Sequence, residues 1–352
     1  MGDDPTAPTD EYLRSLPALG VAPLWRSLGE LVPTEPRPAD LPFLWRYRDI
    51  RPALLRAGEL VSAAEAERRV LMLLNPAPEI AARGGTTSTL YAGIQLVLPG
   101  EIARAHHHVQ GAFRFVIEGE YGAFTTVEGE RALMRPGDLV LTPNWRFHDH
   151  GNESDEPVIW LDGLDLPLVN LFNAGFFELH EDEAQKRTRP DGASTHAYIH
   201  GRLNPAWEAH RSPHSPVVNY PWSETERALA AAMGDGADTP TDGVLFEYTN
   251  PLTGGSVMPT LSCFVQALYP GQHTQARRRT PSTVYHAVRG TGTTIVDGQE
   301  LSWEPGDTFC VPSWSVSEHV NGSASEEAVL FSFTNHHVYT SLDLYREEIV
   351  EP

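Results

Sequence analysis

Cysteine and long apolar runs are scarce in this chain of 352 residues, and each shortage excludes a class of protein. The two cysteines, Cys263 and Cys310, are too few for a disulfide framework or a thiolate zinc site. No apolar run reaches the length of about eighteen residues that a membrane helix needs, and the acidic start MGDDPTAPTDEY does not resemble a signal peptide. We therefore expect a cytoplasmic protein with no membrane partner.

Positive charge is also in short supply. Lysine and arginine number 26 against 47 aspartates and glutamates, which gives a formal net charge of -21 at pH 7. Such a surface repels nucleic acid, so we expect no nucleic-acid partner. An anionic substrate would need a local cationic pocket, which draws attention to any arginine near a candidate site.

The remaining composition indicates a folded, mainly β protein. Hydrophobic residues make up 41% of the chain and aromatic residues 9%, which excludes general disorder. The 29 glycines and 29 prolines favour many short strands separated by turns over helical bundles. The length allows two domains.

Two stretches of sequence bring three histidines together. The first reads PGEIARAHHHVQGAFRFVIEG, and the second, further along, reads RPGDLVLTPNWRFHDHGN. His106 and His108 lie two apart in a strand-like run, so both imidazoles face one side while His107 faces the other. His148 follows a strand punctuated by Pro and Gly, and a small closed antiparallel barrel would return it beside the first pair. Three neutral imidazoles inside a barrel form a metal site with open positions.

The residue types alone leave the metal open among zinc, copper, nickel and ferrous iron. No glutamate or aspartate lies between His108 and Arg114 to act as a fourth ligand. A divalent ion would keep its full charge, which suits a chelating anionic substrate and dioxygen.

The chain also contains its own copy. VQALYPGQHTQARRRTPSTVYHAVRG matches IQLVLPGEIARAHHHVQGAFRFVIEG without gaps, and EPGDTFCVPSWSVSEHVNG matches RPGDLVLTPNWRFHDHGN. The first pair is offset by 171 residues, as from Gly100 to Gly271, and the second by 169, as from Gly137 to Gly306. Repeats this far apart indicate two copies of one domain, since a solenoid has a period of roughly 20 to 50 residues.

The two copies differ where the chemistry is expected. Glycines, prolines and a tryptophan persist in both, as turns and core packing require. The histidines do not persist, and the changed positions are His106 to Arg277, His108 to Arg279 and His148 to Ser317. We predict a metal site in the first copy and a metal-free second copy. The role of the cluster Arg277, Arg278 and Arg279 stays open.

Outside the copies, the sequence predicts helices. Residues 10–32 and 48–69 are predicted to be largely helical, with Pro52 at a first helical position and Gly58 as a candidate break. Residues 173–216 form a polar connection. After it, PWSETERALAAAM is typical of a short helix with Ser223 as its N-cap and Glu226 at the capping-box position.

The histidine motifs resemble those of the cupin superfamily. The matching positions are Gly100, His106, His108 and Gly119 in its first motif, and Gly137, Pro143, His148 and Asn152 in its second, with Trp145 where glycine is usual. From about Trp45 to the C-terminal SLDLYRE, the chain is similar to the bicupin gentisate 1,2-dioxygenases, on stretches such as AERRVLMLLNP, TLYAGIQLVLPGE and WLDGLDLPLVN. Related ring-cleaving enzymes that act on salicylate or 1-hydroxy-2-naphthoate share this scaffold.

The resemblance implies a mainly β bicupin fold, with two β-barrel (double-stranded β-helix, jelly-roll) domains, N-terminal helical segments and a short linker helix. The expected parts are an N-terminal arm with helices over 1–80, a metal-binding cupin domain over 81–172, a linker with a short helix over 173–243, and a second, metal-free cupin domain with a C-terminal tail over 244–352. The family forms homotetramers with N-terminal segments that contribute across subunits. PLWRSLGELVP is a candidate for such an arm, and an ordinary helix over its own barrel is the alternative.

The resemblance also implies site residues. The family binds ferrous iron, Fe(2+), through three histidines, which are His106, His108 and His148 here, and holds the substrate carboxylate with an arginine that corresponds to Arg114. Arg114 lies six residues after His108, so an unbroken strand would turn it to the same interior face. A buried arginine without an anion would be costly, which favours an anionic ligand.

Further roles follow from the same resemblance. His150 corresponds to a histidine that hydrogen-bonds the substrate or acts as acid and base, although its counterpart His319 leaves a structural role open. Asp162 matches a carboxylate near a ring hydroxyl, and Trp160, two residues earlier, is expected on the same face.

The remaining substrate-binding residues are less sharply defined by the sequence. Gln95 has a twin in Gln266, which leaves a shared structural role open. Tyr91 is expected to tune substrate size. Arg69 is the favoured second arginine, although the sequence does not separate it from the adjacent Arg68.

The implied activity opens gentisate (2,5-dihydroxybenzoate) between the carboxyl-bearing and the adjacent hydroxyl-bearing carbons to give maleylpyruvate, in aromatic compound catabolism. The partners would be a small aromatic acid and dioxygen. A salicylate or 1-hydroxy-2-naphthoate 1,2-dioxygenase is the alternative. A metal-dependent cupin isomerase or hydrolase would turn over without oxygen, and a small-molecule-binding protein would not need open metal positions.

Overall fold

The computed structural model describes residues 7–198, 205 and 212–351. The chain divides into two compact units, Met1–Arg37 and Pro38–Pro352. The first unit contains α1 (Ala7–Ser15), the 3-10 helix η1 (Leu16–Leu19) and α2 (Leu24–Leu31), so residues 10–32 are largely helical as predicted. The helix α2 is amphipathic, and its apolar residues Leu24, Trp25, Leu28 and Leu31 are exposed.

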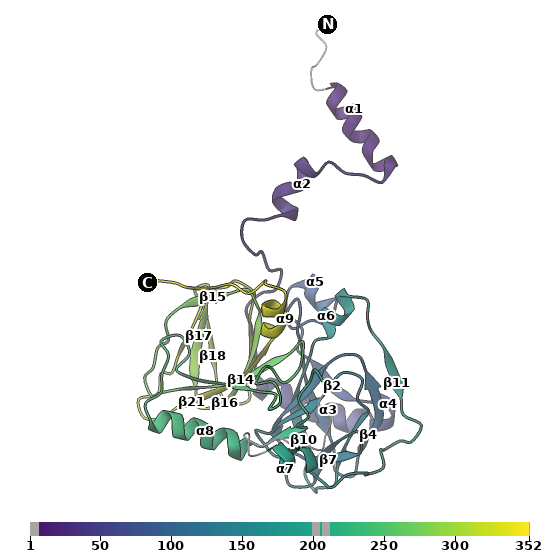
Figure 1. Cartoon of the computed structure of the whole chain (residues 1–352), viewed down its shortest axis with the longest axis vertical. Coiled ribbons are helices and arrows are strands. Elements are labelled where there is room, and N and C mark those ends of the chain that lie inside the picture. The colour runs from purple at the N-terminus through teal and green to yellow at the C-terminus, as the bar shows by residue number, and fades with distance from the viewer. Residues whose placement is uncertain (1–6, 199–204, 206–211, 352) are drawn as a thin grey trace. The chain divides into compact units, whose positions relative to one another are not determined.

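The second unit is built from four antiparallel sheets, two in each of its halves (Figure 1). In the first half, one sheet consists, in order, of β12 (Asn219–Tyr220), β8 (Leu139–Thr142), β5 (Ala112–Glu118), β10 (Val158–Leu164), β3 (Tyr91–Val97) and β2 (Arg69–Met72). The facing sheet consists of β11 (Phe177–Leu179), β4 (Ile102–His108), β9 (His148–Asn152), β6 (Ala123–Val127) and β7 (Glu130–Leu133).

The second half repeats this plan. Its first sheet consists of β1 (Phe43–Trp45), β19 (Thr308–Val311), β16 (Thr283–Arg289), β21 (Ala328–Thr334), β14 (Ser262–Leu268) and β13 (Val244–Tyr248). Its facing sheet consists of β18 (Gln299–Trp303), β17 (Gly292–Val296), β20 (Ser317–Val320), β15 (Arg277–Arg279) and β22 (Glu347–Ile349).

Two facing antiparallel sheets in each half are the jelly-roll arrangement of a cupin, so the predicted mainly β bicupin fold is confirmed. Each half is an open jelly roll rather than the closed barrel that we expected, because the pairings between the described strands do not join its two sheets. One reason is the turn after His108, where the chain leaves β4 in one sheet and enters β5 in the other without continuing the ladder.

Helices of the second unit connect and cover the sheets. They are α3 (Tyr47–Leu60), α4 (Ala63–Ala66), α5 (Pro78–Ala81), α6 (Leu166–Leu171), α7 (Ala193–Tyr198), α8 (Trp222–Gly234) and α9 (His336–Ser341). The predicted polar connection 173–216 contains β11 and α7, and its residues 199–204 and 206–211 lie outside the described residues.

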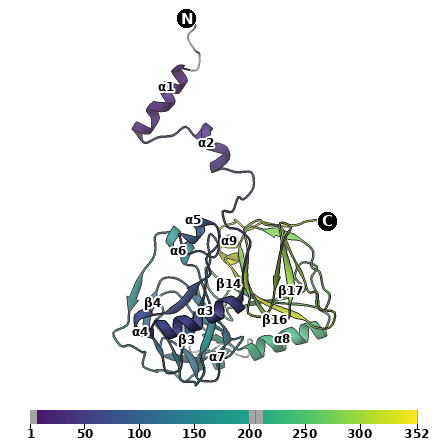
Figure 2. The same ribbon diagram turned by 180° about the vertical axis from the view of Figure 1, so that it is seen from behind.

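The repeat is longer than the cupin motifs. The first half begins with the run β1–α3–β2, and the second half begins with the equivalent run β12–α8–β13. The leading strand of each run pairs with the other half, β1 with β19 and β12 with β8. The helix then contacts its own half, and Figure 2 shows α3 lying beside β3. The N-terminal and linker segments are therefore equivalent elements that cross between the halves.

Two aspartates cap the crossing helices. Asp307 Oδ1 accepts a hydrogen bond from the amide of Tyr47 at the start of α3, and Asp138 Oδ1 accepts one from Trp222 at the start of α8, both at 2.8 Å. A carboxylate at this place satisfies a free amide and interacts favourably with the helix dipole.

These caps change where the helices begin. We predicted Ser223 as the N-cap of α8, and this is wrong. The helix already begins at Trp222, whose amide donates a hydrogen bond to Asp138. Pro52 lies inside α3 rather than at its first position, since the helix already begins at Tyr47. Gly58 does not interrupt α3, which runs on to Leu60.

One hydrophobic core joins the two halves. Phe115 of the first half stacks on Phe331 of the second with ring centroids 4.2 Å apart, and Phe113 meets Phe333 edge to face at 4.9 Å. All four rings are buried in the same cluster. The halves share this core, and each also has a smaller buried cluster of its own.

Candidate metal centre

The three predicted ligands come from neighbouring strands of one sheet. His106 and His108 lie on β4, and His148 begins β9 opposite His106 in the antiparallel register. The ring of His148 lies 4.2 Å from that of His106 and 4.9 Å from that of His108, measured between centroids. One nitrogen from each side chain lies within 4.8 Å of the others, and this is the single such group among the described residues.

Each imidazole is oriented by a backbone carbonyl two residues away. The Nδ1 atoms of the three histidines lie 2.8, 2.8 and 2.9 Å from the carbonyl oxygens of Arg104, Gln110 and Arg146. Because a carbonyl only accepts, each Nδ1 carries the proton and each Nε2 keeps a lone pair. The buried Nε2 atoms of His106 and His148 have no hydrogen-bond partner, which a metal ion would supply.

The surroundings also keep these histidines neutral. Burial, and then the charge of Arg68, lower the pKa of His106 to about 2. Burial and Arg114 lower that of His108 to about 3, and burial drives the pKa of His148 well below its ordinary value. Neutral imidazole is the form that binds a metal, so the donor set fits a divalent ion.

His107 faces away from its two neighbours, as predicted. Its ring stacks on Phe147 at a centroid distance of 4.2 Å, and its Nε2 lies 2.9 Å from a carboxylate oxygen of Glu178. It therefore belongs to the outer surface of the sheet.

An arginine and a carboxylate face the histidines from the other sheet. Arg114 on β5 and Asp162 on β10 are register partners, and Arg114 Nε lies 3.5 Å from Asp162 Oδ1. Trp160 Nε1 donates to the same oxygen at 2.9 Å, which confirms that Trp160 shares a face with Asp162. Burial raises the pKa of Asp162 to about 6, although Arg114 and Trp160 act to lower it. Burial lowers the pKa of Arg114 to about 10, against the effect of Asp162.

Arg114 reaches this place by a different route from the one we expected. β4 ends at His108 and β5 begins at Ala112 in the facing sheet, so the count of six residues along an unbroken strand does not apply. The turn between the strands sends Arg114 to the opposite wall of the site.

A cavity of about 610 Å³ opens beside these groups, within the usual size range of small-molecule sites. Besides His106 and His108, its polar lining consists of Arg68, Tyr91, Gln95, Gln110, Arg114 and Asp162. Its apolar lining includes Val70, Met72, Leu164, Leu166, Phe176 and Phe177. An aromatic ring with one acidic group matches such a mixture.

Gln95 and Tyr91 both line this cavity, as expected. The Nε2 of Gln95 is buried without a hydrogen-bond partner, whereas its twin Gln266 donates to the backbone carbonyl of Asp242 at 2.8 Å. The first copy thus has a free donor where the second has a satisfied one. Burial and nearby Asp162 raise the pKa of Tyr91, which keeps its hydroxyl protonated.

The structure does not place Arg69 in the cavity, contrary to our prediction. Its guanidinium makes two hydrogen bonds to Glu101, at 2.7 and 2.8 Å, and Nε donates to the Val61 carbonyl. Arg68 lines the cavity instead, because neighbouring residues at the start of β2 point to opposite sides. Burial lowers the pKa of Arg68, and Asp162 acts to raise it.

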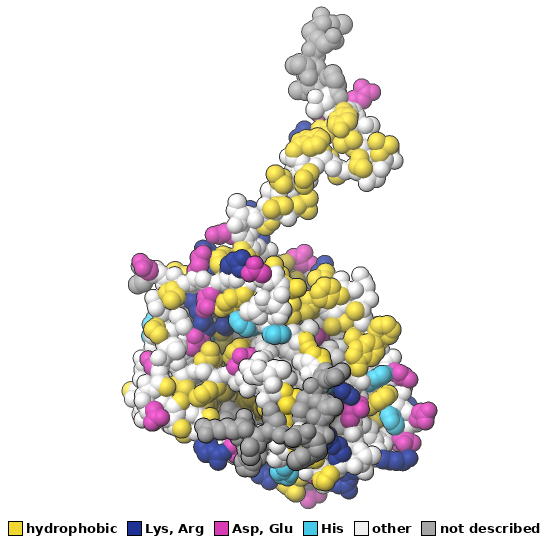
Figure 3. All heavy atoms as spheres, viewed as in Figure 1, with side chains coloured by type: hydrophobic (Ala, Val, Ile, Leu, Met, Phe, Trp, Pro, Cys, Tyr) yellow, Lys and Arg dark blue, Asp and Glu magenta, His cyan; other side chains and the backbone are white. Residues whose placement is uncertain are grey.

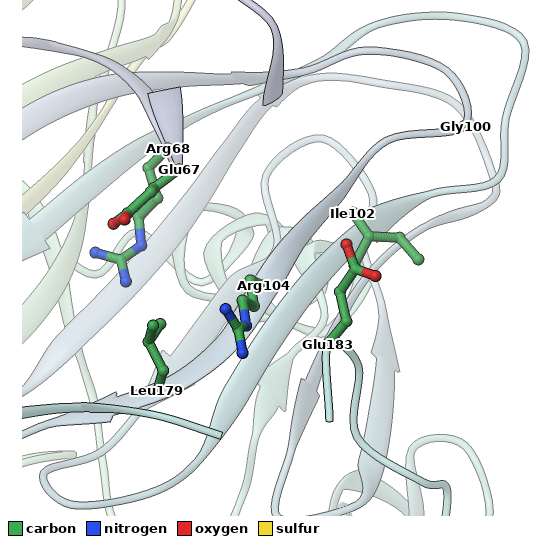
Figure 4. Close-up of a pocket in the computed structure, with 7 residues that line it drawn as sticks. All are labelled: Glu67, Arg68, Gly100, Ile102, Arg104, Leu179 and Glu183. Atoms are coloured by element: carbon green, nitrogen blue, oxygen red, sulfur yellow. The ribbon is translucent and has the colours of Figure 1, made fainter. Parts of the chain in front are cut away.

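A second hollow adjoins the first on the outer side of β4. Figure 4 shows Arg68 on one side of this hollow and Arg104 of β4 on another, with Leu179 below Arg68 in the view. Arg68 lines both hollows. It therefore stands at the boundary between the outer surface and the candidate site.

His150 lies behind His148 and does not line the cavity. Its Nδ1 lies 2.8 Å from Thr125 Oγ1, and its buried Nε2 has no hydrogen-bond partner. The second half has the same pair, since His319 Nδ1 lies 2.9 Å from Thr294 Oγ1. The threonine–histidine contact is therefore part of the shared framework.

Sequence reasoning missed the aromatic wall. Phe177 on β11 pairs with His108 in the strand register, and its ring stacks on His106 at 5.6 Å. The three-residue strand β11 pairs with residues far away in sequence, so no local alternation of polar and apolar residues could reveal it.

In the second half, the positions of the metal ligands are filled by a network of charges. Arg277 forms ion pairs with Asp242 and with Glu347, the latter at 2.9 Å. Arg279 donates to the hydroxyl of Tyr285 at 2.9 Å, and Tyr285 is the counterpart of Arg114. Arg278 pairs with Glu348 at 2.8 Å. The arginine cluster thus has structural partners within its own half.

The two jelly rolls and the histidine centre in one of them define a bicupin. Residues 93–164 match the model of the cupin domain. The chain is 43% identical over 337 residues to gentisate 1,2 dioxygenase 1 of Aquipseudomonas alcaligenes, covering 96% of this chain and 95% of that protein. It is 42% identical over 331 residues to 5-aminosalicylate 1,2-dioxygenase of Comamonas sp, covering 93% and 87%.

A solved structure agrees with these relatives. The salicylate 1,2-dioxygenase of Pseudoaminobacter salicylatoxidans, crystallised as an adduct with gentisate, has a TM-score of 0.91 at 34% identity and covers 100% of this chain and 96% of that chain. The chain belongs to the family of the gentisate 1,2-dioxygenases and related ring-cleaving dioxygenases.

Proposed function

We propose that this protein is an iron-dependent dioxygenase that opens gentisate between the carboxyl-bearing and the adjacent hydroxyl-bearing carbons to give maleylpyruvate. Both atoms of dioxygen enter the product, so the reaction needs no further reductant. One observation carries the proposal: three neutral imidazoles converge at one point, and two of them line a cavity together with two arginines. The names of the relatives support the same substrate class.

The donor set suits ferrous iron, with His106, His108 and His148 as ligands. When bound, Fe(2+) would bind the carboxylate and ortho hydroxyl of the substrate together with dioxygen, and would let electron density pass between ring and oxygen. The protein itself contributes orientation and charge, which are set by residues around the centre.

Two arginines would bind the substrate carboxylate. Arg114 is buried, its ion pair to Asp162 is long at 3.5 Å, and its Nη1 donates to Thr142, so the guanidinium keeps further N–H groups for an anion. Arg68 stands at the mouth of the cavity. In a protein of net charge -21, these two cations provide the local attraction that an anionic substrate needs.

The remaining polar groups would act on the ring substituents. Asp162, with its pKa near 6, can accept the proton of a ring hydroxyl at neutral pH. Gln95 offers its free amide as a hydrogen-bond donor, and Tyr91 closes one side of the ring pocket. His150 does not line the cavity, but its ring centroid lies 5.6 Å from that of His148, and its free Nε2 would serve as the acid or base that the family resemblance implies.

A second substrate has specific support. The Comamonas relative acts, by its name, on 5-aminosalicylate and is almost as similar as the gentisate relative. Both acids carry an electron-donating group para to the ortho hydroxyl, which favours ring oxidation. Salicylate and 1-hydroxy-2-naphthoate lack that group and are the remaining candidates.

Oxygen uptake tests the proposal. Iron-loaded protein should consume one dioxygen per gentisate and form a ring-opened acid, with slower or no uptake on salicylate and 1-hydroxy-2-naphthoate. Turnover of any substrate without oxygen would favour a cupin isomerase or hydrolase. Anaerobic binding of gentisate followed by no uptake on admitting air would rule out gentisate as the substrate.

We also propose that the protein forms a homo-oligomer, with a tetramer expected from the family. Hydrophobic side chains gather on the face over α6 (Figure 3), where Leu171, Phe172 and Phe176 are each more than 60% exposed. An exposed apolar patch of this kind typically marks a protein contact. In the first unit, α2 presents the apolar residues that an inter-subunit arm would need.

Within the described residues, no helix has the length and hydropathy to cross a bilayer.

A further inference from the structure

We propose that the second half of the molecule holds the metal ligand His108 in place through Thr260, a positioning residue. The inference rests on the proposed metal centre and gives the second half a role in it. It starts from the turn Val109–Gly111, which directly follows His108 and ends at β5.

This turn sets the orientation of the ligand. The carbonyl oxygen of Gln110 lies 2.8 Å from His108 Nδ1 and fixes the tautomer that leaves Nε2 for the metal. A shift of the turn would therefore rotate the imidazole. The side-chain amide of Asn144 also donates to the carbonyl of Val109, which anchors the turn from within the first half.

Residues of the second half enclose the same turn. A β-carbon placed on Gly111 would lie 3.4 Å from Met258 Sδ and 3.5 Å from Thr260 Oγ1, and 3.2 Å from Asn144 Oδ1. The turn is thus lined by side chains of both halves, and a shift of the second half would reach it.

Thr260 is tied to the turn through Asp165. The hydroxyl of Thr260 donates to the carboxylate of the buried Asp165, and the amide of Asp165 lies 3.4 Å from the carbonyl of Gly111. Thr260 is itself anchored, since the side-chain amide of Asn335 donates to its carbonyl at 2.7 Å. A chain of contacts therefore runs from the second half to the ligand.

The equivalent of the Thr260–Asp165 contact at the repeat-related position is different. Asn335 corresponds to Asp165, and Thr89 corresponds to Thr260, at offsets of 170 and 171 residues. The hydroxyl of Thr89 is buried without a hydrogen-bond partner. The hydroxyl–carboxylate link between the halves therefore occurs beside the turn that follows His108 and not at the equivalent position in the other copy.

Titration with Co²⁺ tests the inference without depending on turnover. Thr260→Val removes the hydroxyl but keeps the shape, and we expect about tenfold weaker Co²⁺ binding with a shifted visible absorption band. In iron-loaded protein, kcat should fall by roughly the same factor. Thr260→Ser, which keeps the hydroxyl, should restore the wild-type affinity and spectrum.

A matched control breaks the contact on the other side. Ser282→Ala removes the hydroxyl pair between Ser282 and Thr87, which also links the halves at 2.8 Å, and Ser282 is the counterpart of Gly111 in the second half. It should leave Co²⁺ affinity and spectrum unchanged. Equal losses in Thr260→Val and Ser282→Ala would overturn the proposal, because they would report docking of the halves in general.

The remaining outcomes are also decisive. Wild-type Co²⁺ affinity and spectrum in Thr260→Val would contradict the proposal. If that variant does not fold, Gly111→Ser, which introduces the residue of the mirror turn, should weaken Co²⁺ binding, and wild-type binding would contradict the proposal. Failure of the wild-type protein to bind Co²⁺ would instead contradict the metal centre itself.

Discussion

Neighbouring histidines on β4 have opposite surroundings, and substitutions should separate them. His106→Ala removes an unpartnered, buried ligand atom, and we expect loss of bound metal and of turnover. His107→Ala removes a surface stack and an exposed pair with Glu178, and both metal and turnover should persist. Metal analysis and oxygen uptake of the two purified variants check this prediction. Iron retained in His106→Ala would remove that residue from the ligand set.

The adjacent arginines should likewise differ in which property they affect. Arg68→Gln removes a cation at the cavity mouth and should raise KM for gentisate roughly tenfold or more, the value of one charge-assisted hydrogen bond. Arg69→Gln breaks the paired hydrogen bonds to Glu101 and should lower the free energy of unfolding by about 1–3 kcal/mol, with KM unchanged. Steady-state kinetics and denaturant unfolding of both variants measure the split. A raised KM in Arg69→Gln alone would reverse the assignment.

The raised pKa of Asp162 predicts how kcat/KM depends on pH. Its pKa is raised to about 6, so the ionised form that accepts a proton is lost as the pH falls through 6, and kcat/KM should fall with it. The Trp160 hydrogen bond lowers this pKa. Trp160→Phe should therefore raise it further and move the acid limb to higher pH. Profiles of kcat/KM from about pH 5 to 8 would show the move, and an unmoved limb would exclude Asp162 as the titrating group.

At the scale of residues, the three histidines could be predicted because two signals are present in the sequence itself. These are the strand period of two and the loss of all three histidines in the second copy. The sequence did not separate Arg68 from Arg69, because adjacent residues differ only in which side of the strand they occupy. The family resemblance indicated Arg114, but the even spacing from His108 was a wrong reason for its interior position, since the turn after His108 changes sheets.

At the scale of elements, the crossing helices α3 and α8 are held by carboxylates from the half opposite to the one that they cover. The glycine before each carboxylate is required, since a β-carbon on Gly306 would lie 2.6 Å from the Tyr47 ring and one on Gly137 would lie 2.5 Å from Trp222. The same device appears in both copies, which indicates that it was part of the unit that was duplicated.

Removal of one cap should be measurable. Asp307→Ala leaves the first amide of α3 unsatisfied and also removes the ion pair of Asp307 with Arg46, so we expect a loss of about 2 kcal/mol in the free energy of unfolding. Glu304→Ala, which removes an exposed pair with Arg48 at 3.5 Å, is the control and should change stability by less than about 1 kcal/mol. Urea unfolding of both variants gives the comparison. Equal small losses would mean that the cap does not hold the helix.

Most of the elements could be predicted, but their pairings could not. The alternation along β4 and β9 and the repeat offsets are local or periodic signals. The short strands β1, β11 and β12 gain their pairing from partners far away in the chain, as Phe43 does from Cys310. A strand of two or three residues has no period of its own, so tertiary contacts decide its structure.

At the scale of the whole molecule, two copies of one unit share a core and divide the work. Phe115 and Phe331 stack across the boundary, so each half stabilises the other. The first half keeps three neutral imidazoles and an open cavity, while the second fills the equivalent positions with ion pairs such as Arg277 to Glu347. Among the described residues, a group of three convergent histidines therefore occurs in the first half alone.

The central claim is that three imidazoles of the first half bind one iron ion. Anomalous X-ray scattering at the iron absorption edge, from crystals of iron-loaded protein, tests it most directly. We predict one strong peak per chain at bonding distance from the Nε2 atoms of His106, His108 and His148. A loaded protein with no peak at that place, or with its peak beside Arg277 in the second half, would contradict the account.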